Sequence, residues 1–418
     1  MTSGRREFLR QVAVGAAAAV VPRHYAAGAA PKRVAAVVTH YTHNSHADVI
    51  VSKLLQTYTL DGRGSRPDLK LVSLYVDQFP TNDMGRQLAK EHGFRLCESI
   101  AEALLLGEKD LGVDGVFLIG EHGNYPESDT GQVMFPRRRF FEETMAVFRQ
   151  VGRAVPVFND KHFAWNWEDA NWMYDTAQEL KVPLMAGSSV PGTWRHPPLD
   201  MQRGAAAKEA VGLSFGGLEA YGFHGLEAIQ CLAERRRGGE TGVAAVQYAE
   251  GDAVWMAAEA GRFDLSVFNA AANAREAKGR AKGDFRTALK PAAFFIEYRD
   301  GFRAVLVHDL GPVNGEWIVA WSEEGREHQA TVFWTQEARP LGHFSFLVQG
   351  IEKMIQTGVP TWPAERTLLT TGILAAAFQS RKQGGVRIET PHLAIAYQPT
   401  FTWSPPEPPP PGRPFDQQ

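Results

Sequence analysis

The chain has little cysteine, little net charge and few long apolar runs. Its two cysteines among 418 residues, Cys97 and Cys231, lie far apart and have apolar neighbours. This indicates buried structural thiols and excludes a disulfide framework or a redox pair. A formal net charge of −3 offers no basic surface to nucleic acid. We therefore expect a small-molecule partner and no nucleic acid.

Long apolar runs are missing after the N-terminal region, which predicts no membrane span in the mature chain. The N-terminus has twin arginines, Arg5 and Arg6, followed by the alanine-rich run 12–21 and by small residues suited to cleavage. This order is typical of a twin-arginine (Tat) export signal, to which we assign residues 1–31. A membrane anchor is the alternative, but the run is shorter than the ~20 residues that a span requires. We expect a periplasmic or extracytoplasmic protein.

Glycine is missing where the first predicted strand meets the first predicted helix. Residues 33–39 form a short apolar run typical of a buried strand, and Ser45 with Asp48 forms a capping pattern that predicts the start of a helix. Strand, turn and helix in this order open a nucleotide-binding unit, in which a Gly-rich turn lets a pyrophosphate approach the backbone. The turn here, residues 40–44, has two histidines, a tyrosine and no glycine. Either a dinucleotide binds in an altered way, or the scaffold serves other chemistry.

Strands and helices alternate up to about residue 200, which predicts a Rossmann-type, doubly wound parallel sheet over residues 32–200. Asp77 ends the second predicted strand, where an acid can bind the ribose of a dinucleotide; starting a turn is its alternative role. Ligands of such sheets bind at the carboxyl edge, so the loops there supply candidates for cofactor binding. These candidates are Thr39, Asn44, Ser45, His46, Asp77, Glu121, His122, Asn124 and Asp160.

The pattern changes near Val211, which predicts a second, α+β domain over residues 201–403. Aromatic-rich runs joined by short turns predict a mainly antiparallel open sheet, and Asp300-Gly301 predicts a hairpin. The strands are expected at 243–248, 253–256, 292–298, 302–309, 316–321 and 330–335, with covering helices at 223–236, 343–356 and 364–383. The proline-rich residues 404–418 are expected to be a disordered tail.

One segment of the first domain resembles the Gfo/Idh/MocA sugar and inositol dehydrogenases. The run VPVFNDKHFAWNWEDANWMYDTAQELKVPLMAG is similar to the part of that family in which a strand ends in Glu-Lys-Pro and is followed by a helix and a strand. Lys161 falls on the family's Lys. Asp160 stands where the Glu is usual, and His162 where the Pro is usual.

A second segment, at the start of the second domain, is also similar to this family. The residues from Tyr221 to Glu227 resemble its Asp-x-Gly-x-His stretch, which opens the helix lining the substrate pocket. His224 falls on the catalytic His, and Ala220 stands where the family often has Asp. The resemblance covers roughly residues 33–395.

The resemblance implies an oxidoreductase that acts on a sugar or cyclitol with NAD or NADP. Lys161 and His224 would flank the substrate hydroxyl, with His224 as the base and Lys161 orienting the oxygen. An exported enzyme cannot easily recycle free NADH, so a tightly bound cofactor is expected. A homo-oligomer is expected because the family's open sheets often pair face to face. The substrate-binding candidates are His162, Trp165, Trp194 and Tyr221, since an indole can stack on a pyranose ring.

Histidines in the expected edge loops support two alternatives. Imidazole with carboxylate is a ligand set for zinc and other transition metals, which would make the chain a non-redox lyase, hydrolase or epimerase with a divalent metal. No compact His spacing is present, so no metal ligand is assigned. The other alternative is a sugar-binding protein without turnover. The residues that could gather are His40, His43, His46, His122, His162, Glu121 and Asp160.

Overall fold

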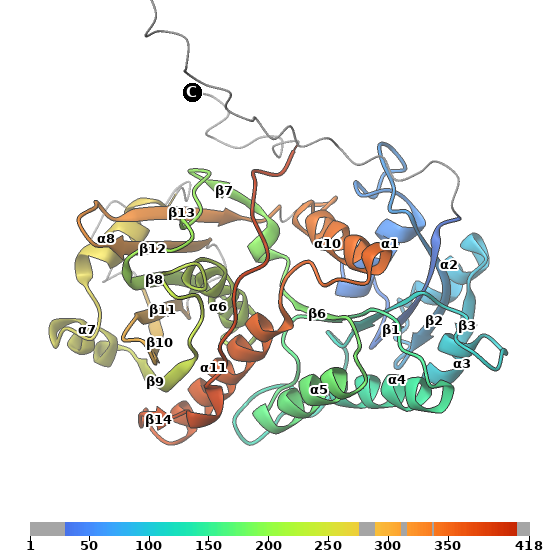
Figure 1. Cartoon of the computed structure of the whole chain (residues 1–418), viewed down its shortest axis with the longest axis horizontal. Helices are drawn as coiled ribbons and strands as arrows, with labels where there is room; N and C mark the ends of the chain where they lie inside the picture. The colour runs from blue at the N-terminus through green and yellow to red at the C-terminus, as the bar shows by residue number, and fades with distance from the viewer. Residues whose placement is uncertain (1–29, 276–288, 311–315, 337, 408–418) are drawn as a thin grey trace, which may run out of the picture. The chain divides into compact units, whose positions relative to one another are not determined.

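The computed structural model describes residues 30–275, 289–310, 316–336 and 338–407. The predicted signal segment lies outside the described residues except for Ala30 and Pro31, and so does the predicted tail beyond Glu407. From Lys32 onward the chain forms one compact unit that contains two sheets and the helices packed on them (Figure 1). Among the described residues, no helix has both the length and the apolar content needed to cross a membrane.

The first sheet is parallel throughout, with the strand order β3-β2-β1-β4-β5-β6. The order reverses direction between β1 and β4, so the predicted Rossmann-type sheet is confirmed. Its central strands are buried on both faces, as their continuous apolar runs predict. The strands are β1 (Lys32–Val38), β2 (Leu69–Val76), β3 (Arg95–Cys97), β4 (Gly115–Ile119), β5 (Val157–Asp160) and β6 (Leu184–Gly187).

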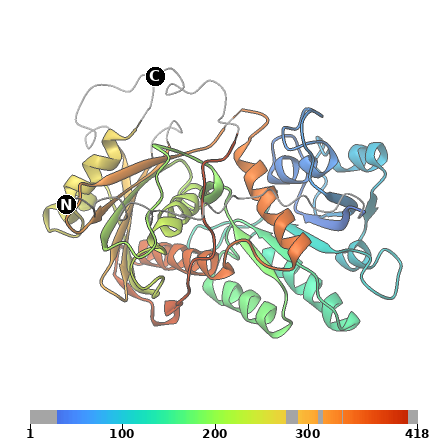
Figure 2. The same cartoon turned by 45° about the horizontal axis from the view of Figure 1, so that its top comes forward.

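Helices cover both faces of this sheet. One face packs against α1 (His46–Leu55), α2 (Gly85–His92) and α10 (His343–Thr357). The other packs against α3 (Ile100–Leu105), α4 (Arg137–Val151) and α5 (Trp167–Glu179). The expectation that α10 covers the second sheet is wrong, because this helix packs beside α1 (Figure 2). Its apolar face suits either sheet, so helical periodicity alone does not select the partner.

The start of α1 has the predicted cap. Ser45 Oγ accepts the N–H of Asp48 at 3.3 Å, and the Asp48 carboxylate accepts the N–H of Asn44 at 2.9 Å. Both bonds satisfy amides that the first helical turn leaves unpaired. The same chemistry begins α3, where Ser99 Oγ accepts the N–H of Glu102 at 3.1 Å. The cap on α1 places its first turn directly after β1, at the carboxyl edge of the sheet.

The second sheet has eight strands in the order β14-β9-β10-β11-β8-β12-β13-β7 and is mainly antiparallel, as predicted. The hairpin expected at Asp300-Gly301 joins β10 to β11. The sequence did not predict β7, β8 or β14, although β8 lies inside the sheet and pairs in parallel with β11. The strands are β7 (Trp194–His196), β8 (Ala207–Phe215), β9 (Val243–Glu250), β10 (Pro291–Tyr298), β11 (Arg303–Asp309), β12 (Trp317–Glu323), β13 (Gln329–Trp334) and β14 (Ile388–Glu389).

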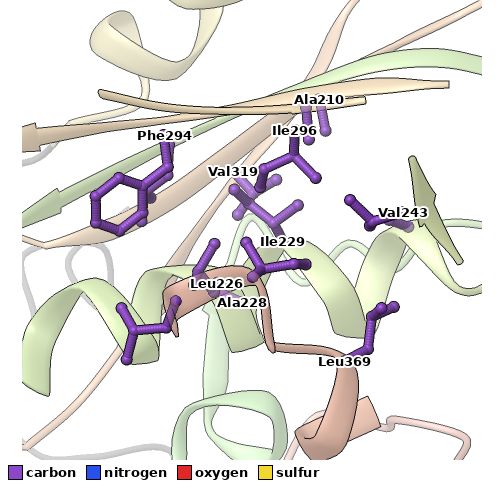
Figure 3. Packing of buried hydrophobic residues seen from close by; sticks show 14 of the residues in the cluster. Ala210, Leu226, Ala228, Ile229, Val243, Phe294, Ile296, Val319 and Leu369 are labelled. Atoms are coloured by element: carbon purple, nitrogen blue, oxygen red, sulfur yellow. The ribbon is translucent and has the colours of Figure 1, made fainter. Parts of the chain in front are cut away.

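Both faces of the second sheet are covered by the chain itself. Helices α6 (Ala220–Ala233) and α11 (Ala364–Lys382) cover one face, where Ile229 and Leu226 of α6 point at the strands (Figure 3). Helices α7 (Asp252–Glu259) and α8 (Leu265–Asn273) cover the other. The face-to-face pairing that suggested a homo-oligomer would therefore have to displace α7 and α8.

The strand expected at 253–256 is wrong, because these residues lie inside α7. A short apolar run is compatible with either period, and its helix-forming neighbours decide the outcome here. The run continues into Ala257, Ala258 and Glu259, and Val254 and Ala258, four residues apart, are the buried pair. This spacing is that of one face of a helix.

Candidate active site

The carboxyl edge of the first sheet brings together side chains from distant loops. The loops after β1 and β4 are joined by a hydrogen bond from Thr39 Oγ1 to the carbonyl oxygen of Glu121, 2.5 Å long. The next residue, His122, has left-handed backbone (φ +69°), as does Lys161 after β5 (φ +54°). This conformation costs energy for a residue other than glycine, so it persists only where the surrounding structure stabilises it. Residues of this kind cluster at functional sites.

Lys161 is buried and lies in a charged cluster. Its Nζ donates to Glu121 Oε1 at 2.8 Å, while Arg137 pairs with the other oxygen of Glu121. Burial alone would raise the pKa of Glu121, but the charges of Lys161 and Arg137 outweigh it and hold that pKa well below its ordinary value. Glu121 is therefore ionised, and it holds two cations at the edge of the sheet.

His162, the neighbour of Lys161, belongs to the same cluster. Its Nε2 lies 3.0 Å from Arg137 Nη1 and 3.5 Å from the Glu219 carboxylate. Burial and then the charge of Arg137 lower the pKa of His162. A neutral ring bridging two elements fits a structural role at least as well as the predicted substrate contact.

His224 comes from α6, which packs on the second sheet. Its Nδ1 lies 2.5 Å from Ser188 Oγ, and its ring packs edge-on against Trp317 with ring centres 5.2 Å apart. Burial, followed by the charges of Lys161 and His46, lowers the pKa of His224 well below its ordinary value. Ser188 follows Gly187, whose carbonyl oxygen accepts the backbone N–H of Lys161 at 3.1 Å, so Lys161 and His224 are both joined to the end of β6.

His46, the first residue of α1, forms a pair with Asp160 at the end of β5. The distance from His46 Nδ1 to Asp160 Oδ2 is 2.7 Å, and the Asp160 side chain is buried. His122 lies beside His46, with ring centres 5.3 Å apart. Burial and then the charge of His46 lower the pKa of His122 to about 4, so His122 is neutral at pH 7.

The predicted residues at the adenosine side of the edge are bonded to other parts of the chain. The Asp77 carboxylate accepts the hydroxyls of Tyr75 and Tyr125 at 2.8 and 2.7 Å and also pairs with Arg139. The backbone of Asn124 exchanges two hydrogen bonds with the Gln78 side chain, which closes the loops after β2 and β4 on each other.

The β1–α1 turn is filled by side chains where a Gly-rich turn would be open. Tyr41 is fully buried and its hydroxyl lies 2.7 Å from Ser52 Oγ. Asp48 is also fully buried, and Arg339 binds it with two nitrogens, at 2.7 and 3.3 Å, and contacts Asn44. The cradle that lets a pyrophosphate touch the backbone is absent from this turn.

The aromatic candidates separate into two places. Tyr221 stacks on Trp317, with ring centres 5.5 Å apart, next to His224. Trp194 lines a different cavity of about 690 Å³, beside Phe346, and donates its indole N–H to the carbonyl of Pro406. Trp165 is half-buried in the turn before α5. Sequence reasoning missed Trp317, which had no signal beyond being an apolar strand residue.

Metal binding has no support in the described part of the chain, where no three His, Cys, Asp or Glu side chains form a group that could hold an ion. His40 and His122 stack, with ring centres 5.6 Å apart, and His43 is an exposed ring 3.7 Å from Asp48. The histidines therefore meet one another and single carboxylates, not a shared centre.

His343, on α10, makes the stability of the fold sensitive to acid. It is buried, its Nδ1 accepts the N–H of Gln336 at 3.2 Å, and burial, then the charges of Lys53 and His46, lower its pKa from 6.5 to about 3. Below pH 6.5 the unfolded chain takes up a proton that the folded chain refuses, so stability falls as the pH falls toward 3. Replacing His343 with Asn keeps an acceptor that does not titrate.

We expect His343→Asn to reduce the stability lost between pH 7 and pH 4.5 by about 2 kcal/mol. Urea denaturation of both proteins at the two pH values measures this difference. Equal losses in the two proteins would contradict the assignment of this acid sensitivity to His343.

No family model matches the chain, and no curated protein matches it. Among solved structures, GenD2 from gentamicin A biosynthesis, in complex with NAD, is similar over 86% of this chain and 97% of its own, with a TM-score of 0.57 and 15% identity. A putative myo-inositol dehydrogenase from Sinorhizobium meliloti 1021 is similar over 86% and 99%, with a TM-score of 0.53 and 12% identity. A probable dehydrogenase from Thermotoga maritima is similar over 86% of this chain and 99% of its own, with a TM-score of 0.52 and 12% identity. The predicted Gfo/Idh/MocA-type fold is therefore confirmed.

Proposed function

We propose that the protein is an NAD- or NADP-dependent oxidoreductase of the Gfo/Idh/MocA type that acts on a sugar or cyclitol at the carboxyl edge of the first sheet. The fold shared with dehydrogenases supports an oxidoreductase. The observation that carries the proposal is that Lys161 and His224 are both joined to the end of β6: the backbone N–H of Lys161 donates to the carbonyl oxygen of Gly187 at 3.1 Å, and Ser188 Oγ lies 2.5 Å from His224 Nδ1. These are the two positions that the family resemblance assigned to catalysis.

Each side chain of the cluster has a part in this proposal. Lys161 donates a hydrogen bond to the substrate oxygen, and its positive charge stabilises that oxygen as the proton leaves. Glu121 holds Lys161 in place through a hydrogen bond, and Arg137 pairs with the other oxygen of the same carboxylate. Tyr221 and Trp317 offer an apolar wall to the carbon face of a sugar ring.

The described residues fit the nicotinamide end of a dinucleotide. His40 Nε2 and His122 Nε2 are buried and have no hydrogen-bond partner within the described residues. They follow β1 and β4, the two strands between which the strand order reverses. A bound water or ligand can satisfy such atoms, and ligands of this fold bind where the strand order reverses. Bound NAD or NADP would accept hydride from the substrate carbon.

The part of the sheet edge that would face the adenosine of a dinucleotide differs from a Gly-rich turn. Asp77, Gln78 and Asn124 are engaged with their own chain, and Asp48 places a negative charge at the start of α1. A pyrophosphate is not attracted to such a turn, so we propose that the diphosphate is held outside it. Arg339, which lies beside Asn44 and is partly exposed, offers a cation at that place.

Cofactor content tests the proposal. The protein is expressed with its own signal segment, purified after export and denatured. The supernatant is then analysed for NAD(H) and NADP(H) by mass spectrometry. We expect dinucleotide close to one per chain, or tight binding of added dinucleotide, and reduction of it by a member of a sugar and cyclitol panel. Absence of both binding and reduction would overturn the proposal.

A second candidate is a non-redox carbohydrate-active enzyme, a lyase, hydrolase or epimerase. The closed adenosine side, with Gln78 bonded to Asn124 and Asp77 bonded to Tyr125, favours it. It predicts protein without dinucleotide that nevertheless converts a sugar. The mass-spectrometric measurement and product analysis of the same panel separate the two candidates.

Export is part of the proposal as well. The twin arginines Arg5 and Arg6 and the following alanine-rich run support assignment of residues 1–31 to Tat export. Fusion of these residues to a reporter that functions only after folded export tests this. Loss of export on replacing both arginines with lysine is the expected result, and unchanged export would contradict it.

A further inference from the structure

The pair formed by His46 and Asp160 has the geometry of an oriented proton acceptor. The two residues are 114 positions apart in sequence, and the 2.7 Å bond joins the first turn of α1 to the end of β5. The Asp160 side chain is 1% exposed, whereas that of His46 is 12% exposed. An ionised carboxylate only accepts hydrogen bonds, so the ring proton lies on Nδ1 and the lone pair on Nε2.

The opposite nitrogen of His46 remains accessible. Within the described residues no group bonds to His46 Nε2. Unlike Nε2 of His40 and Nε2 of His122, this atom is not buried. The ring is held edge-on against Phe344, with ring centres 5.1 Å apart, and beside His122. A carboxylate on one side and packed rings around it fix the direction of the free lone pair.

His46 and His224 differ in the side chains that contact them. His224 is buried against Trp317, and its ring Nδ1 is engaged with Ser188 Oγ. No carboxylate is within hydrogen-bonding distance of His224 among the described contacts, whereas His46 has Asp160 to stabilise its protonated form. An imidazole with a buried carboxylate partner is the better acceptor of a proton from a hydroxyl.

We infer that His46 is the general base of the site and that Asp160 is its positioning residue. This inference rests on the proposed function, in which a substrate hydroxyl loses its proton. The O–H bond breaks, the electron pair stays on oxygen next to Lys161, and the proton forms a new N–H bond at His46 Nε2. The proton on Nδ1 stays with His46 and keeps its bond to Asp160. Deprotonation thus comes from the first turn of α1, where the glycines of a dinucleotide turn are missing.

The tautomer of His46 tests the geometry without any substrate. Protein labelled with nitrogen-15 histidine is examined by NMR above neutral pH, and His46→Gln identifies the His46 signals. We expect the Nδ1–H form in the wild-type protein, its loss in Asp160→Ala and its return in Asp160→Glu. An Nε2–H form in the wild-type protein would overturn the inference whatever the enzyme's activity.

Chemical modification tests the accessibility of Nε2. Diethyl pyrocarbonate acylates accessible neutral imidazoles, and peptide mass spectrometry locates the product. His43 is the internal reference, because its side chain is 66% exposed and it lies in the same turn. We expect both histidines to react and Asp160→Ala to slow the reaction of His46 alone. Reaction of His43 without His46 would overturn the inference.

Steady-state kinetics test the role of His46 as the general base. His46→Gln is expected to lower kcat about 10³-fold with little change in KM, while His43→Gln leaves both unchanged. Asp160→Ala should lower kcat, and Asp160→Glu should recover part of it. Full activity of His46→Gln would overturn the inference and leave the proposed oxidoreductase standing. If the wild-type protein neither binds nor reduces a dinucleotide, the proposed function fails, and the tautomer and modification results alone decide whether the pair is an oriented base.

Discussion

Replacing Lys161 with methionine is expected to lower kcat for the oxidised sugar or cyclitol about 10³-fold. Methionine replaces the apolar stem of the side chain but removes the ammonium that bonds Glu121 Oε1 at 2.8 Å and that the proposal places against the reacting oxygen. Glu121 keeps Arg137 as its counter-ion, so the fold should persist. Steady-state kinetics, with a thermal melt of each protein, measure the effect.

Lys181→Met is the matched control for this substitution. Lys181 also has left-handed backbone, with φ +52° against +54° for Lys161, but it is exposed and remote from Glu121 in the described contacts. The same change of side chain on the same backbone should leave kcat unaltered. Comparable activities of the two variants would remove Lys161 from the active site.

Replacing Gly242 with alanine is expected to cost about 4 kcal/mol of folding free energy. Gly242 has φ +89°, and an added Cβ would lie 2.3 Å from the carbonyl oxygen of Leu393 and 2.7 Å from the amide nitrogen of Ile395. Both are backbone atoms, so the clash cannot be relieved by turning a side chain. Urea denaturation compares the variant with the wild-type protein.

Gly238→Ala separates backbone strain from the clash. Gly238 has φ +91° but nothing within 4 Å of an added Cβ, so this variant carries the strain alone, about 1 kcal/mol. A similar loss in both variants would show that the contact with Leu393 and Ile395 contributes nothing. Neither residue belongs to the candidate site, so activity of the folded fraction should be normal in both.

The first sheet was predictable because its strands are continuous apolar runs separated by capped amphipathic helices. Ser45 and Ser99 marked two helix starts correctly, since a cap is a local interaction. In the second domain the same approach failed at 253–256, where a short apolar run carries no decisive period. It also missed β8, which pairs in parallel with β11 almost a hundred residues later.

The candidate site was only partly predictable. The family resemblance placed Lys161 and His224 at one site, and in the structure both are bonded to the end of β6, through Gly187 and Ser188. It did not indicate that Glu121 pairs with both Lys161 and Arg137, or that Trp317 borders His224. These three partners come from three separate parts of the chain, and nothing in the spacing of one part identifies the others.

Local sequence by itself determined the alternation of strands and helices, and with it the parallel sheet whose carboxyl edge carries the site. Tertiary structure alone decided which side chains meet there. His46 and Asp160 were both expected at that edge, yet only the register of α1 against β5 turns them into a bonded pair. The physical reason is range: hydrogen bonding and periodicity along the chain act over a few residues, whereas a pairing across a sheet depends on how whole elements pack.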